Sequence, residues 1–372
     1  MIQAYSAHQT RRLRMQAQGL LSPGSGLSTA QVLRRICGVQ AQDLSAARLS
    51  IRARSTGLTA LQVEKARQEE RTIAWIWFIR GTLHLVTTED ARWLIPFLGP
   101  ALIAGDRRRF EQLGWNDQLA ESATHIIVEA MHKHNTLTRP EIIQLLEKNG
   151  FPSQGQAPVH LLYRAALQAT LCYGPDRGKD NTYVLFEKWL GESQPLAREV
   201  ALAKFARRYL GAYGPAGPED FAGWSGLKRS EARQAWQLIA DEIVQIEAAG
   251  TPAWLLKTSL SKLDEAFDSA VQVRLLPRFD TYLLGYTDRN LVVDPSYARR
   301  IHPGGGIIHP VLLVDGQATG TWKTKQRRAN LEIQIEPFQP IADVLLPQIE
   351  IEVADLGRFL NKKTTFSITR PT

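Results

Sequence analysis

In the stretch Ile73-Ala74-Trp75-Ile76-Trp77-Phe78-Ile79-Arg80-Gly81-Thr82-Leu83-His84-Leu85-Val86, two β-prone runs meet at a tight turn. Residues 73–78 and 82–86 are rich in β-branched and aromatic side chains, and Arg80-Gly81 lies between them. This pattern predicts a two-stranded hairpin. Three short helices are predicted before it, with Ser6, Ser28 and Asp43 as their N-terminal caps. Three helices followed by a hairpin form the plan of a winged helix.

The same order of helices and wing recurs twice along the chain, without obvious sequence identity between the units. In the second unit, Thr138 and Glu141 form a capping box that opens a helix. The other predicted elements are helices at 120–132 and 158–169 with a wing strand at 182–186, and then helices at 201–209, from Pro218 and at 228–239 with strands at 243–247 and 253–257. This repeated pattern predicts three tandem winged-helix units.

The remaining quarter of the chain has a different pattern. Residues 275–284, 311–314 and 331–335 are strand-like, Asp315-Gly316 is a two-residue hairpin signal, and 341–360 returns to helix. We therefore predict a mainly α fold with β structure (α+β). Its domains are winged helices at 1–115, 116–192 and 193–270, and a β-rich extension with a closing helix at 271–372.

Charge and composition narrow the classes of partner. The chain has 372 residues, and 45 Lys and Arg against 37 Asp and Glu give a net charge of +8, which favours phosphate backbones or anionic surfaces. No apolar run is long enough for a membrane span, and the N-terminus lacks the pattern of a signal peptide. Cys37 and Cys172 match no metal-site spacing. We expect a cytoplasmic, nucleoid-associated monomer without cofactor, metal or membrane contact.

Two glutamines flank one small residue in Gly38-Val39-Gln40-Ala41-Gln42-Asp43. A glutamine amide donates and accepts hydrogen bonds but does not ionise, so the pair can hold a water or a polar group and cannot act as a strong base. Residues two apart share a face only in an extended segment. If Gln40 and Gln42 act together, we expect them to lie outside regular helix.

Basic residues supply candidate contacts to nucleic acid. Arg48 and Arg52 are four apart, and we expect them on an outer face of the third predicted helix. The run 323–328 lies between two strand candidates, where a hairpin turn would present Lys323, Lys325, Arg327 and Arg328 to phosphates or to a narrow minor groove. The alternative is a solvated turn that protects a sheet edge.

Three segments resemble the winged-helix DNA glycosylases of the AlkZ/YcaQ type, a family that includes azinomycin-resistance and interstrand-crosslink glycosylases. The segments are 38–42, 80–86 and 275–285, in the order of the family. The resemblance implies tandem winged helices in a C-shaped DNA clasp. It also implies an active-site signature of Gln, an apolar residue, and Gln or Asp, which Gln40 and Gln42 match. Ala41 is smaller than the usual middle residue.

The resemblance further implies the substrate and the contacts. The Gln-x-Gln form is similar to the branch that protects producers of DNA-crosslinking natural products, whereas the Gln-x-Asp branch resembles a broader repair activity. We expect Gln40 and Gln42 to position a water for hydrolysis at N7-alkylated guanine in double-stranded DNA, including crosslinked guanine. Arg80, His84 and Arg278 lie in the resembling segments and are predicted to contact DNA.

Two other classes of protein fit tandem winged helices. A non-catalytic regulator would bind one preferred DNA sequence and leave alkylated DNA unchanged. A protein-interaction module would show no salt-dependent DNA binding. The Gln-x-Gln signature favours the enzyme.

Overall fold

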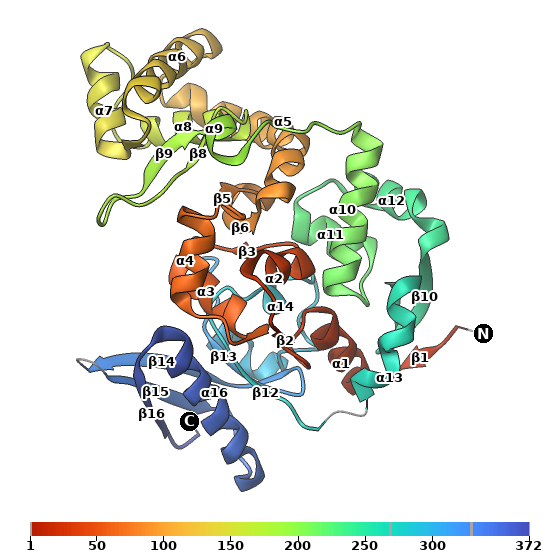
Figure 1. Ribbon diagram of the computed structural model, residues 1–372. Helices are drawn as coiled ribbons and strands as arrows, with labels where there is room; N and C mark the ends of the chain where they lie inside the picture. The colour runs from red at the N-terminus through yellow and green to blue at the C-terminus, as the bar shows by residue number, and fades with distance from the viewer. Residues whose placement is uncertain (1, 268–269, 328–329, 372) are drawn as a thin grey trace. The chain divides into compact units, whose positions relative to one another are not determined.

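The computed structural model describes residues 2–267, 270–327 and 330–371. The chain forms two compact units, one of residues 1–63 with 202–372 and one of residues 64–201. The mixture of helices and strands confirms the predicted α+β class (Figure 1). The finer division into three winged helices and an extension stays a prediction. Within the described residues, no helix is both long and apolar enough to cross a membrane.

The N-terminal helices of the first unit begin where the sequence predicts. Ser6 and Ser28 form capping boxes with Gln9 and Gln31, and Asp43 accepts hydrogen bonds from the backbone N–H groups of the third helix. The elements are β1 Ala4–Tyr5, α1 Ala7–Ala17, β2 Gly24–Ser25, α2 Thr29–Ile36, β3 Val39–Gln40, α3 Leu44–Arg52 and β4 Ser55–Thr56.

A second group of helices in this unit precedes a hairpin, in the order predicted for the third winged helix. The elements are α10 Arg198–Tyr213, α11 Pro218–Ser225, α12 Arg229–Leu238, β10 Ile243–Ala248, β11 Thr251–Leu256 and α13 Leu263–Phe267. The hairpin turns at Ala249 and Gly250 as expected, and β1 pairs in parallel with β10. Buried aromatic rings, including Tyr209 and Trp224, fill the space between the helices.

The C-terminal part contains a five-stranded sheet in the order β12-β13-β14-β15-β16. Its elements are β12 Val273–Leu276, α14 Thr281–Leu284, α15 Ala298–Ile301, β13 Val311–Val314, β14 Gln317–Arg327, β15 Asn330–Pro337, α16 Leu346–Leu360 and β16 Lys363–Ile368. The predicted turn at Asp315-Gly316 joins β13 to β14. Alternate residues of β15, such as Ile333 and Ile335, pack with Val353 of α16, the predicted closing helix (Figure 1).

The expected strand at 275–284 is wrong from Pro277 onwards. Strand β12 ends at Leu276, and Pro277 follows it. Proline has no backbone N–H to donate to a sheet ladder. Asp280 then caps the short helix α14 by accepting from the Tyr282 N–H.

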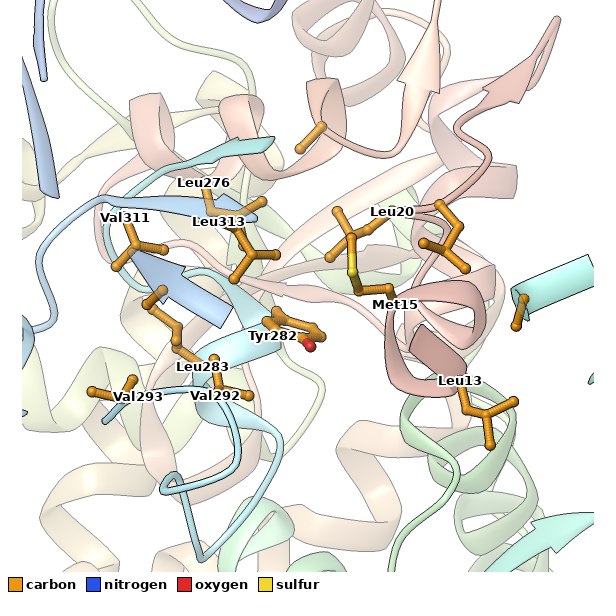
Figure 2. Close-up of a cluster of buried hydrophobic side chains, with 14 of the residues drawn as sticks. Leu13, Met15, Leu20, Leu276, Tyr282, Leu283, Val292, Val293, Val311 and Leu313 are labelled. Carbon is orange, nitrogen blue, oxygen red and sulfur yellow. The ribbon is translucent and has the colours of Figure 1, made fainter. Parts of the chain in front are cut away.

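One apolar core joins the two ends of the first unit. Figure 2 shows side chains of α1, including Met15, in one cluster with Tyr282 and with Leu313 of β13. All three of these side chains are fully buried. The packing therefore holds the N-terminal helix against the C-terminal sheet segment.

The second unit contains the predicted 73–86 hairpin and the helices of the predicted second winged helix. Its elements are β5 Ile73–Trp77, β6 Leu83–Thr87, α5 Thr88–Gln112, α6 Asp117–His134, β7 Leu137–Thr138, α7 Arg139–Lys148, α8 Ala157–Leu167, β8 Leu171–Tyr173, β9 Thr182–Leu185 and α9 Phe186–Leu190, and α4 Ala60–Gln68 crosses its boundary. Helix α5, which contains Pro96 and Pro100, was not among the predicted elements. Prolines normally interrupt a helix, and tertiary packing overrides that preference here.

A buried polar network fixes the loop after β12 to helix α3. Arg54 donates to both carboxylate oxygens of Asp280 at 2.8 and 2.7 Å, and neither side chain is exposed. Ser50 donates to the same carboxylate at 2.7 Å, and Gln18 accepts from Arg54 at 2.7 Å. The bidentate geometry fixes the relative orientation of the two side chains and also strengthens the contact.

Removing the charge of Asp280 should destabilise the first unit. We expect Asp280→Asn to lower the free energy of unfolding by about 3–5 kcal/mol, because Arg54 then remains buried without its counter-charge. Denaturant titration measures this loss. Asp241→Asn is the matched control, because Asp241 is exposed. An equal effect of the two substitutions would contradict a stabilising role for the pair.

Candidate active site and DNA interface

Gln40 and Gln42 lie in an extended segment between two helices. Positive φ angles at Cys37 (55°) and Gly38 (91°) end α2 and redirect the chain into β3. Val39 and Ala41 are fully buried, whereas Gln40 is half-buried and Gln42 exposed. Both glutamines lie outside helix, as expected, with Gln40 at the end of β3 and Gln42 in the bend before α3. That their side chains share a face stays a prediction.

Asp43, the next residue, is committed to two structural contacts. Its Oδ1 accepts hydrogen bonds from the backbone N–H groups of Ser45 and Ala46 at 2.9 and 3.2 Å. Its Oδ2 lies 3.8 Å from a guanidinium nitrogen of Arg278, whose side chain is 45% exposed. The guanidinium also lies 4.7 Å from the centre of the Phe279 ring. Arg278 is therefore placed beside the glutamine segment with much of its charge open to solvent.

A groove of about 840 Å³ opens beside this contact, entirely within the first unit. Its cationic lining comes from Arg278, Arg299, Arg300 and Lys323, with His309 and the carboxylates of Asp43 and Glu336. Apolar side chains complete its lining, among them Leu49, Pro277, Pro310 and Trp322. The sequence analysis did not single out Arg299 or Arg300. Their adjacency in the chain was the only available signal, and it does not indicate what they face.

The expectation that Arg52 lies on an outer face of its helix is wrong. Its side chain is fully buried and makes ion pairs with Glu352 at 3.0 Å and Asp355 at 3.1 Å. It also donates to the Leu275 carbonyl at 2.8 Å. The C-terminal sheet and α16 cover this face of α3, which the local helical pattern could not reveal. Arg52 cannot reach DNA in this structure, whereas Arg48 is half-buried, with a contact to Ser45 at 3.3 Å.

His84 is likewise buried, at 4% exposure, and does not present its ring to solvent. Its Nδ1 lies 3.0 Å from the Thr82 carbonyl, and its ring meets Phe78 edge to face. Burial lowers the pKa of His84 to about 3, against a smaller opposing effect of the Thr82 hydrogen bond. A neutral, enclosed imidazole cannot neutralise a phosphate. Arg80, at the turn between β5 and β6, is exposed.

The basic run 323–328 lies mostly in a strand, not in a turn. β14 continues to Arg327, which pairs with Asn330 of β15. Lys323 and Lys325 are exposed on the strand, and Lys323 is paired with Glu336. Arg328 lies outside the described residues, as does the side chain of Arg327. Cross-strand pairing continues through the run as far as Arg327. Lys323 and Lys325 therefore lie along the strand and not at the turn.

Most of the chain matches known DNA glycosylases. Residues 33–359 match the model of the family "DNA glycosylase AlkZ-like", so the chain belongs to this family and is a DNA glycosylase, a hydrolase of N-glycosyl bonds. The predicted family membership is confirmed. An interstrand DNA cross-link repair glycosylase of Streptomyces sahachiroi is 28% identical over 368 residues, covering 93% of this chain and 94% of the relative. The solved structure of the Streptomyces sahachiroi DNA glycosylase AlkZ matches with a TM-score of 0.80 and 25% identity, covering 98% of this chain and all of the other.

The burial of His84 should make stability depend on pH. The folded pKa is about 3, and the unfolded pKa is about 6.5, so the unfolded chain binds a proton first as the pH falls. The stabilising contribution of the neutral, buried His84 is complete above pH 6.5. It is lost progressively as the pH falls from 6.5 towards 3. Between pH 7 and pH 5 this loss is about 2 kcal/mol. We expect His84→Asn to remove this part of the pH dependence in denaturant titrations. His132→Asn, at an exposed position, should leave it in place.

Proposed function

We propose that this glycosylase hydrolyses the N-glycosidic bond of N7-alkylated guanine in double-stranded DNA, and that it unhooks guanines joined in interstrand crosslinks. The observation that carries the proposal is that two neutral amides, Gln40 and Gln42, lie outside helix just before Asp43, which lines a basic groove. The similarity to a relative named for cross-link repair supports the same substrate class.

The chemistry of the lesion suits neutral residues. Alkylation at N7 leaves the purine positively charged, so the base departs without a strong general acid. In the proposed step, water oxygen bonds to C1′ while the C1′–N9 bond breaks, its electron pair neutralises the base, and the water proton passes to solvent. Acceptor oxygens near C1′ stabilise the oxocarbenium character that the sugar gains.

Each glutamine has a role in this proposal that follows from its exposure. Gln42 is the more exposed of the two and orients the attacking water through its amide oxygen. Gln40 is half-buried and holds the same water or the sugar from the core side. The carboxylate of Asp43 does not serve as the base in this proposal, because its oxygens face two backbone N–H groups and Arg278. The two glutamines therefore select substrates whose base is already a good leaving group.

A crosslinked guanine imposes a further constraint on recognition. It remains tethered to the opposite strand, so it cannot swing fully out of the helix as in base flipping. We infer that the enzyme instead probes the groove side of the lesion with the hairpin of β14 and β15. The exposed lysines Lys323 and Lys325 lie on this hairpin and support its contact with DNA.

Substitution of either glutamine tests the active site. We expect Gln40→Ala and Gln42→Ala to lower single-turnover release of N7-methylguanine by about 10²–10³-fold, the loss typical for one positioned polar group. Duplex affinity should change by less than about threefold, because the amides carry no charge. Counting alkali-labile abasic sites measures the rate.

Gln118→Ala is the matched control, because Gln118 is an exposed glutamine on α6. Wild-type rates in both the Gln40 and Gln42 variants would reject the proposed mechanism. A wild-type protein that binds DNA but releases no base would indicate a regulator instead.

Shortening the hairpin separates crosslink recognition from the chemical step. Thr324 and Ile333 are cross-strand partners, so replacing residues 325–332 with Asn-Gly keeps the register. We expect this variant to unhook an interstrand crosslink at least about tenfold more slowly while it still excises a monoadduct. Gel separation of unhooked strands measures the first rate. Equal rates for the variant and the intact protein on both substrates would exclude a probing role.

A further inference from the structure

The groove beside Asp43 contains a cluster of cations that no motif in the sequence explains. Arg299 and Arg300 come from α15, Arg278 from the loop after β12, and Lys323 from β14. Counting Asp43 and Glu336 against these four cations leaves the groove with a net charge of +2 when His309 is neutral. We propose that this groove binds the DNA sugar–phosphate backbone next to the reacting nucleotide, and that Arg299 and Arg300 are its main anchors. This inference rests on the proposed active site at Gln40 and Gln42.

Arg299 is the more accessible of the two anchors. It is exposed at the groove, and its side chain makes no hydrogen bond or ion pair with any residue that the structure describes. Arg299 therefore gives up no hydrogen bond or ion pair with a described residue when it binds a phosphate. Its planar fork can donate two parallel hydrogen bonds to phosphate oxygens.

Arg300 is held in place by an aromatic stack. Its guanidinium carbon lies 4.6 Å from the centre of the Phe338 ring, and Tyr297 stacks on Phe338 with ring centres 4.4 Å apart and planes within 15°. Cation–π contact restrains the guanidinium against the face of the ring. The side chain is therefore partly ordered before DNA arrives, which lowers the entropic cost of binding.

The other two cations of the groove are balanced by carboxylates. Arg278 faces Asp43, and Lys323 is paired with Glu336. These carboxylates also repel phosphate, so they place the strongest attraction of the groove at its α15 end, where Arg299 is exposed. A backbone phosphate is the occupant that fits, because an uncharged alkyl chain gains nothing from several cations of one sign.

The position of the groove relates the backbone to the chemistry. Asp43 lies in its lining and follows Gln42 directly in the chain. Both Asp43 and Leu49, which lines the groove as well, belong to the α3 segment that starts beside the glutamines. A phosphate held here fixes the register of one strand relative to Gln40 and Gln42, which is the usual role of backbone contacts.

The test measures duplex affinity as a function of salt for Arg299→Gln, Arg300→Gln and the double variant. We expect each single substitution to reduce the slope of log affinity against log salt by about one, equally for undamaged and N7-methylated duplexes. Arg299→Lys should keep the wild-type slope, because lysine also binds phosphate as a point charge. Arg370→Gln is the matched control, because Arg370 is exposed and does not line the groove.

A substitution with the opposite expected effect on DNA affinity completes the experiment. Glu336→Gln removes a negative charge from the same groove and should tighten binding of both duplexes. Unchanged slopes in both Arg299→Gln and the double variant would overturn the proposal. A loss confined to the N7-methylated duplex would overturn it too and assign the groove to the adduct.

Binding and base release are measured separately, so the two proposals can fail independently. If the slopes fall as expected but the wild-type protein releases no base, the groove stands and the proposed chemistry fails. If base release is intact and the slopes do not change, the groove proposal fails alone.

Discussion

The buried pair of Arg54 and Asp280 is the contact on which the arrangement of the first unit depends. It joins two segments that lie 226 residues apart in the chain, and both side chains are sealed from solvent. Such a pair tolerates little displacement, because a buried charge without its partner is costly. It fixes the loop that carries Arg278 to the end of α3, while the start of α3 carries Asp43. The glutamine segment and the basic loop are thereby held on one rigid support.

The distribution of arginines shows why net charge is a poor guide to the binding surface. Arg12, Arg52, Arg54 and Arg67 are nearly completely buried and bind carboxylates of the protein itself. Much of the basic composition therefore stabilises the fold. Cations such as Arg299 and Lys325 remain exposed, and these are the side chains that can attract phosphate.

The two proposals assign complementary tasks to neutral and charged groups. Neutral glutamines do not repel an electron-poor base, and they avoid the desolvation cost that a buried carboxylate would incur. The charged groove supplies attraction at a short distance from them, where it holds the strand without entering the reaction. This division lets affinity come from the backbone and selectivity from the reactivity of the lesion.

The sequence by itself determined the local elements, because their causes are local. Ser6, Ser28 and Thr138 cap helices through hydrogen bonds to residues three positions away, and Asp315-Gly316 has the conformational freedom for its turn. The position of Gln40 and Gln42 outside helix was also predictable from their spacing, and the motif residues identified the family. Only the tertiary structure decided the environment of each charge. Arg52 looks like a surface group in the linear pattern but is buried against α16 and β12, and Arg299 and Arg300 line a groove only because chain folding brings α15 beside α3. Burial is a sum over contacts that are remote in sequence, so no local pattern contains it.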